Sequence, residues 1–133
     1  MKKLLFLLFP ICLIIVSCSK DESTQEEEQA RLEKMYQEII DYSQINSKSC
    51  VNPEEWGFIK FGDYSCTGYI IHNKKIDVSI FKEKIDKYVE ARGKFDAKWG
   101  IFYVFDCAQM PPPSSIECIN EKPTLIYGNT THQ

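Results

Sequence analysis

An apolar run near the N-terminus limits the fold more than any other part of the sequence, because it determines which part of the chain belongs to the folded domain. Lysines precede the run, it covers residues 4–16, and Cys18 follows after a single serine. A helix of this length spans about 20 Å, short of the roughly 30 Å hydrocarbon core of a bilayer, and Pro10 weakens it further. A positive start, a short apolar run and a small residue are typical of a signal peptide, whereas a permanent transmembrane helix is the alternative. We therefore expect residues 1–17 to be cleaved.

The end of this segment indicates how it is processed. Ile15-Val16-Ser17-Cys18 resembles the lipobox of bacterial lipoproteins, an aliphatic residue, a second small or aliphatic one, a small one and cysteine. The resemblance implies that Cys18 carries a thioether-linked diacylglycerol, that the chain is cut before it, and that a further acyl chain such as palmitate is added to the freed amine. Several long chains give stable anchoring, where a single chain would be marginal. A secreted protein with an ordinary cleavage site is the alternative.

The residues after Cys18 carry a second resemblance. Ser19-Lys20-Asp21-Glu22 is similar to the lipoprotein export signal of one Gram-negative phylum. The resemblance implies that residues 18–24 are a lipidated cysteine and a polar tether on the outer face of the outer membrane. The periplasmic face is the alternative, because so short a motif recurs by chance.

Charge excludes some classes of partner. The formal net charge of −3 becomes −5 when the two lysines of the signal segment are removed. A basic face that neutralises phosphates is therefore not expected, which argues against nucleic-acid binding and against a polybasic contact with anionic lipid.

Four cysteines remain in the mature chain besides Cys18, and they are Cys50, Cys66, Cys107 and Cys118. An even number in an oxidising compartment predicts two disulfides. The spacings of 15, 40 and 10 intervening residues contain no C-x2-4-C pair, so we expect no zinc site, no other metal and no cofactor. Sequence does not choose among the three possible pairings, and we favour the two short loops, Cys50–Cys66 and Cys107–Cys118.

Periodicity predicts an α+β fold. An amphipathic helix is expected over residues 25–44, capped by Ser23 or Thr24, and a longer one from a cap at Asp77 to a stop at Gly100. A single helical turn is expected at 52–56, with Glu55 as a capping residue. Strands are expected at 58–61, 67–72, 101–106, 115–119 and 124–127. The expected domain, residues 50–128, is an antiparallel sheet of about four to five strands with the long helix on one face and a polar tail at 129–133.

The globular part also resembles small, uncharacterised cysteine-containing lipoproteins. The resemblance covers residues 50–127 and rests on Cys50-x5-Trp56, Trp99-Gly100, Asp106-Cys107 and a proline-rich stretch before Cys118. Relatives often carry Cys-Gly-Gly-Pro where this chain has Cys66-Thr67-Gly68. The resemblance implies disulfide and packing roles for these residues, and it implies no activity.

No combination of residues predicts catalysis. Only His72 and His132 are present, so a catalytic triad would depend on His72, and His72 with Asp77 lacks a third metal ligand. None of the common nucleophile, zinc or phosphate-binding motifs occurs. We therefore expect a protein that is not an enzyme.

The stretch between the last two cysteines is the candidate binding loop, formed by Met110, Pro111, Pro112, Pro113, Ser114 and Ser115. Three prolines stiffen it, and a stiff loop loses little entropy when it binds a partner. A rigid connection that protects an edge strand is the alternative. We expect a non-catalytic recognition module of the cell envelope that binds a protein or glycan. The alternatives are an inhibitor or immunity-type protein acting on an envelope hydrolase through residues 108–117, or an accessory subunit docked through its N-terminal helix.

Overall fold

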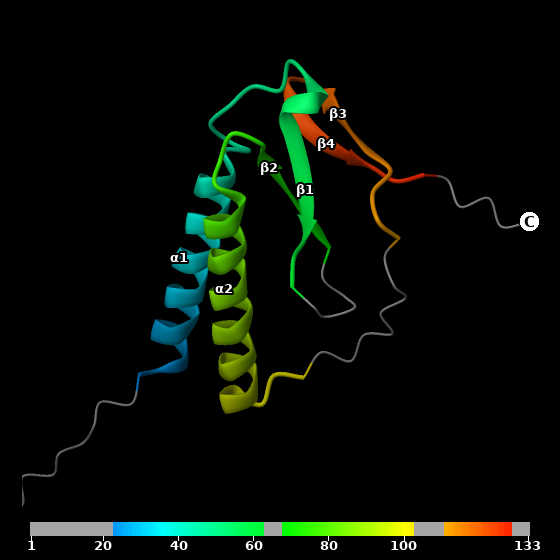
Figure 1. Cartoon of the computed structure of the whole chain (residues 1–133). Coiled ribbons are helices and arrows are strands. Elements are labelled where there is room, and N and C mark those ends of the chain that lie inside the picture. The colour runs from blue at the N-terminus through cyan, green and yellow to red at the C-terminus, as the bar shows by residue number, and fades with distance from the viewer. Residues whose placement is uncertain (1–22, 63–67, 103–110, 129–133) are drawn as a thin grey trace, which may run out of the picture.

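The computed structural model describes residues 23–62, 68–102 and 111–128 (Figure 1). Cys18, Cys66, Cys107, Met110 and the tail therefore lie outside the described residues, as does most of the strand expected at 101–106. The elements are α1 (Gln25–Ser43), the 3-10 turn η1 (Pro53–Glu55), β1 (Trp56–Lys60), β2 (Tyr69–Asn73), α2 (Val78–Trp99), β3 (Ser115–Ile119) and β4 (Lys122–Ile126).

Both predicted helices form and begin at predicted caps. The Thr24 hydroxyl accepts a hydrogen bond from the backbone N–H of Glu27, whose carboxylate accepts one from the N–H of Thr24, so α1 starts in a capping box. The Asp77 carboxylate accepts from two N–H groups in the first turn of α2. Gly100 ends α2 in the left-handed conformation, with φ of 63°. The predicted and observed helix limits agree because these caps and the glycine stop act within one turn of the helix.

The helices pack antiparallel and cover one face of the β1–β2 hairpin (Figure 1). Paired residues of an antiparallel ladder share a face, so Ile59 and Ile70 point to the same side. Ile70 joins Ile39, Phe81 and Ile85 in a buried cluster that unites α1, α2 and β2. This cluster is the first half of the core.

The second half of the core lies on the other face of the same hairpin. Trp56 and Ile71 project there and pack against Ile116 and Leu125, which come from β3 and β4. The molecule is therefore layered, with the helices on one side of β1–β2 and the β3–β4 hairpin on the other (Figure 1).

The prediction of one sheet was wrong in its connectivity. The four described strands form two separate two-stranded antiparallel sheets. Along β3 only Ile116 and Cys118 are partly buried, so the hairpin has one apolar face that must be covered. Stacking face to face against Trp56 and Ile71 covers that face, whereas edge-to-edge pairing would leave it in solvent.

The favoured disulfide pairing was also wrong. Cys50 is bonded to Cys118, with 5.3 Å between the Cα atoms and a sequence separation of 68. This bond excludes both Cys50–Cys66 and Cys107–Cys118. The physical reason is the stacking of the two sheets, which brings β3 beside the segment that precedes η1.

Candidate functional site

The described part of the candidate loop runs along the end of β4. The backbone N–H and the hydroxyl of Ser114 both donate to the carbonyl of Ile126, at 2.7 and 2.9 Å. Pro113 is buried, whereas Pro111 and Pro112 are exposed, and Ser115 begins β3. Because Cys118 is bonded to Cys50, no Cys107–Cys118 bond brackets this loop. Ser114 and Ser115 are also exposed, so in the described part of the loop only Pro113 is buried.

The disulfide itself marks a more defined surface. Val51 follows Cys50 and is 84% exposed, while Ile119 follows Cys118 and is 45% exposed. Because the bonded Cα atoms are 5.3 Å apart, the Cα atoms of Val51 and Ile119 lie within about 13 Å of each other. We call the surface formed by Val51, Ile119 and the Asn120–Glu121 turn the disulfide end.

The backbone of the disulfide end is fixed at several points. The N–H of Cys50 donates to the carbonyl of Glu121 at 2.7 Å, which ties the turn of the β3–β4 hairpin to the segment before η1. Asn120 and Glu121 have φ of 49° and 62°, the left-handed pair that a tight two-residue hairpin requires. The exposed side chains of Val51 and Ile119 are thus carried on a rigid frame.

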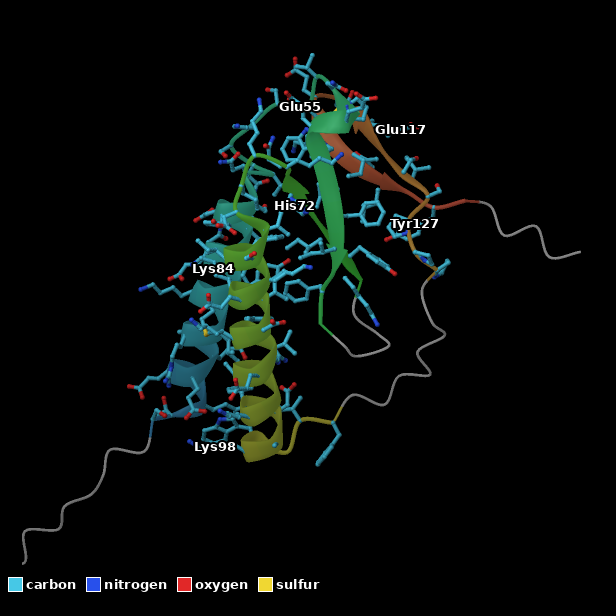
Figure 2. The ribbon with its side chains drawn as sticks, viewed as in Figure 1. Glu55, His72, Lys84, Lys98, Glu117 and Tyr127 are labelled. Atoms are coloured by element: carbon cyan, nitrogen blue, oxygen red, sulfur yellow. A yellow bond between two sulfur atoms is a disulfide. The ribbon has the colours of Figure 1, made fainter. Side chains whose placement is uncertain are left out.

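Glu55 and Glu117 lie at the same end of the molecule (Figure 2). Glu55 lies 3.3 Å from Lys75 across an exposed ion pair, and Glu117 projects from β3. The capping role expected for Glu55 is wrong, because its carboxylate pairs with Lys75 while Asn52 caps η1 alone through the N–H of Glu54. Exposed apolar side chains with charged side chains at the same end are compatible with a protein contact surface, whose core is apolar and whose rim is polar.

His72 is a core residue in this fold. It is 5% exposed, its Nδ1 lies 3.1 Å from the carbonyl of Asn73, and its ring lies 5.4 Å from that of Phe81. Gly57 leaves room for the ring, since a Cβ there would lie 3.1 Å from His72 Nε2. The carboxylate of Asp77 is used by the α2 cap. His72 and Asp77 are therefore engaged in packing and capping.

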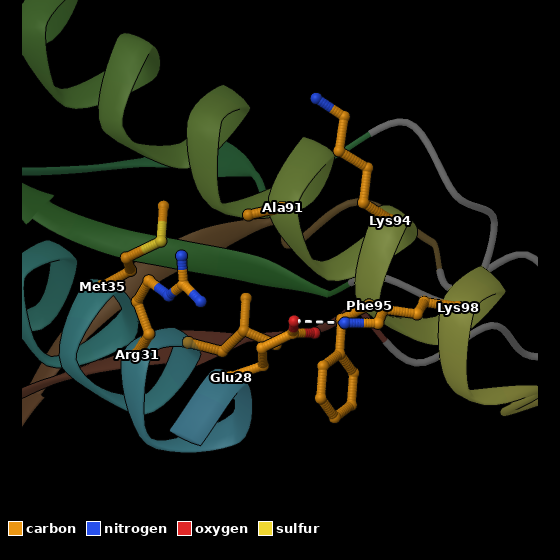
Figure 3. Close-up of a pocket in the computed structure, with 8 residues that line it drawn as sticks. Glu28, Arg31, Met35, Ala91, Lys94, Phe95 and Lys98 are labelled. Carbon is orange, nitrogen blue, oxygen red and sulfur yellow. Dashed lines mark hydrogen bonds and ion pairs between the residues drawn. The ribbon is translucent and has the colours of Figure 1, made fainter. Parts of the chain in front are cut away.

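The opposite end of the molecule contains a polar cluster between the helices (Figure 3). Glu28, in the first turn of α1, accepts hydrogen bonds from Lys98 at 2.7 Å and from Trp99 Nε1 at 2.9 Å, and also from the Ser23 hydroxyl. The bond from Lys98, followed by those from Ser23 and Trp99, lowers the pKa of Glu28 from 4.5 to about 2. This cluster joins the start of α1 to the end of α2.

Beside this cluster, a shallow groove runs between the helices (Figure 3). Arg31, Lys94 and Lys98 lie at its rim, over a floor that includes Leu32 and Phe95. Within the described ranges, no three His, Cys, Asp or Glu side chains come close enough to hold a metal ion. In that same part of the chain, no helix has the length and apolar character needed to span a bilayer.

Neither end of the molecule was predicted from sequence. Glu28 was not connected to Lys98 or Trp99, because these residues lie 70 and 71 positions away in the chain. Antiparallel packing of two helices of similar length would have placed those residues together. The proximity of Val51 and Ile119 could not be predicted from sequence, because it depends on the disulfide pairing. Comparisons of the chain with protein-family models, with curated proteins and with solved structures find no match.

Proposed function

We propose that this protein is a lipid-anchored, non-catalytic recognition module of the bacterial cell envelope, which binds a protein partner through its disulfide end. The lipobox resemblance at Cys18 supports the anchor, and the exposed apolar pair Val51 and Ile119 supports the binding surface. A glycan is the less favoured ligand, because small-ligand sites in proteins use polar groups converging in a concave pocket, and the disulfide end offers two exposed apolar side chains.

The observation that carries the proposal is the opposition of the two ends. Residue 23, where the described chain begins after the tether, lies beside the end of α2, whereas Glu55 and Glu117 lie at the other end of the molecule (Figure 2). The 22 residues of α2 separate these ends by about 33 Å. A chain anchored at Cys18 would thus hold the disulfide end away from the membrane, where a partner can reach it.

The alternative roles are less well supported. An accessory subunit docked through α1 would have to use a largely polar surface with Tyr36 as its exposed aromatic residue, because Leu32 and Ile39 of α1 are buried within the domain. An inhibitor acting through residues 108–117 would present Pro111 and Pro112, but Pro113 is buried and Ser114 is bonded to β4. Both roles need more rearrangement than contact through Val51 and Ile119.

The lipid anchor is tested by metabolic labelling with an alkyne analogue of palmitate. The full chain should become labelled, and Cys18→Ser should remove the label together with the membrane retention of the protein. A labelled Cys18→Ser variant, or an unlabelled wild-type protein, would refute the anchor.

The binding surface is tested by site-specific photo-cross-linking in intact cells. A benzoylphenylalanine is placed at Val51, and the matched control carries it at Glu83, which is 61% exposed on the outer face of α2. Irradiation should give one dominant protein adduct at position 51 that is absent at position 83. The same spectrum of weak adducts at both positions would contradict the proposal.

A further inference from the structure

We propose that the end of the molecule opposite the disulfide end rests in the headgroup region of the membrane that holds the acyl chains. We call this surface the tether end, formed by Ser23, Glu28, Lys98, Trp99 and Phe102. The proposal rests on the lipid anchor proposed above and adds a defined orientation to it, with zwitterionic phospholipid as the ligand.

The length of the tether limits which surface can meet the membrane. Five peptide units separate Cys18 from Ser23, so their Cα atoms can be at most about 18 Å apart, however the residues between them are arranged. Ser23 is hydrogen-bonded to Glu28, which is bonded in turn to Lys98 and Trp99. The end of α2 is therefore held within the same short reach of the lipidated residue, whereas the disulfide end is about 33 Å further away along α2.

The chemistry of the tether end suits a membrane interface. Phe102 is a large apolar side chain, yet it is 83% exposed. Its transfer out of water would be favourable. Trp99 precedes Phe102 by three residues; its Nε1 donates to Glu28, and Lys98 Nζ lies 4.9 Å from its ring centroid. Tryptophan is enriched where water meets lipid, and a lysine there keeps its charge in water while its flexible stem lies on apolar surface. Phe102 adds an apolar side chain to this combination.

The charge of this end favours zwitterionic over anionic lipid. Lys98 is neutralised by Glu28, and Lys94 by Glu90 one turn away. Glu26 and Glu27 add exposed negative charge in the first turn of α1. A surface with its lysines paired gains little from an anionic bilayer, so apolar contact through Phe102 and Trp99 provides the attraction.

The experiment compares two exposed positions in the lipidated protein. Benzoylphenylalanine replaces Phe102 in one variant and Val51 in the other, which are matched in exposure at 83% and 84%. Each protein is purified from membranes, reconstituted in phosphatidylcholine–phosphatidylethanolamine vesicles, floated and irradiated, and phospholipid adducts are measured by intact mass. Position 102 should give about tenfold more lipid adduct than position 51, the ratio expected when one large apolar side chain is buried at the interface.

Each outcome has a distinct meaning. Equal or absent lipid adducts at both positions, in protein that floats with the vesicles, would overturn the orientation and leave the anchor intact. Protein that does not float would overturn the anchor and the orientation together. If adding phosphatidylglycerol strongly raises the yield of lipid adduct at position 102, the assignment to zwitterionic lipid is refuted. A protein adduct at position 102 in intact envelopes would overturn the proposal and assign this end to a protein partner.

A second measurement avoids the unnatural residue. Headgroup spin-labelled lipid should quench the fluorescence of Trp99, which is isolated as the difference between wild type and Trp99→Phe, while Trp56 at 2% exposure provides the protected reference. Phe102→Ser should reduce this quenching, and Val51→Ser should leave it unchanged. Equal quenching in both serine variants would overturn the proposal.

Discussion

Glu28 connects two helices through a single carboxylate. Its folded-state pKa of about 2 lies below the ordinary 4.5, so the ionised group stabilises the folded protein above pH 4.5, and this contribution is lost as the pH falls from 4.5 towards 2. We expect Glu28→Gln to lower the melting temperature at pH 7 and to reduce the decline seen in the wild type between pH 4.5 and 2. Glu83 and Glu90 also contribute to this decline, because Lys87 and Lys94 lower their pKa values. Thermal denaturation monitored by circular dichroism over this pH range tests it. Glu26→Gln, exposed in the same turn, is the control, and an equal effect of both variants would contradict the prediction.

Gly57 is required by the ring of His72. An added Cβ would lie 3.1 Å from both Cε1 and Nε2 of that ring, so the ring, which is buried against Phe81, would have to shift by a few tenths of an ångström. We expect Gly57→Ala to destabilise the domain by about 1–3 kcal/mol through overpacking, measured by urea denaturation. Gly68→Ala is the matched control, since nothing lies within 4 Å of its added Cβ. Similar midpoints for both variants would show that the ring is free to move.

At the scale of the elements, the β3–β4 hairpin depends on the bond between Cys50 and Cys118. The bond closes a loop with a sequence separation of 68, and the chain-entropy model assigns such a loop about 4 kcal/mol. We expect the double variant Cys50→Ser/Cys118→Ser to lose stability of that order in urea denaturation. An unchanged midpoint would mean that packing of Ile116 and Leu125 alone holds the hairpin in place.

The helices could be predicted from sequence because their limits are local. Thr24, Asp77 and Gly100 act within one turn of the residues they cap, and the ion pairs Glu83–Lys87 and Glu90–Lys94 form as their spacing predicts. The start of β4 was missed because proline usually excludes a strand. In a two-residue hairpin, the residue pair next to the pair that closes the turn exchanges no backbone hydrogen bonds. Pro123 and Cys118 form that pair, so the missing N–H of Pro123 costs the ladder no hydrogen bond.

The arrangement of the sheets could not be predicted, because it depends on contacts between distant segments. The alternation of Ile116 and Cys118 shows that one face of β3 is buried, but it does not say what covers that face. The disulfide pairing and the position of the disulfide end depend on which surface covers β3, so they could not be predicted either. The candidate loop was recognisable from its prolines, whereas its anchoring to Ile126 was not.

At the scale of the whole molecule, the observed disulfide leaves a definite prediction for the other cysteines. Of the three pairings that four cysteines allow, only one contains Cys50–Cys118, and it joins Cys66 to Cys107. We expect the mature protein, denatured without reductant, to take up no iodoacetamide, and a peptide that links these two residues to appear in a non-reduced digest. Two alkylated cysteines in the oxidised protein would contradict the second bond.

The position of the Cys50–Cys118 bond also determines how the protein would carry mechanical force. A partner that grips Val51 or Ile119 pulls against the anchor at Cys18, and the shortest covalent route between them crosses only the tether, α1 and the segment up to Cys50. The β1–β2 hairpin and α2 lie in the closed loop between the two cysteines, and β4 follows Cys118, so none of them lies on the loaded covalent path. Tension would therefore stretch one helix along its axis while the surface that holds the partner keeps its shape.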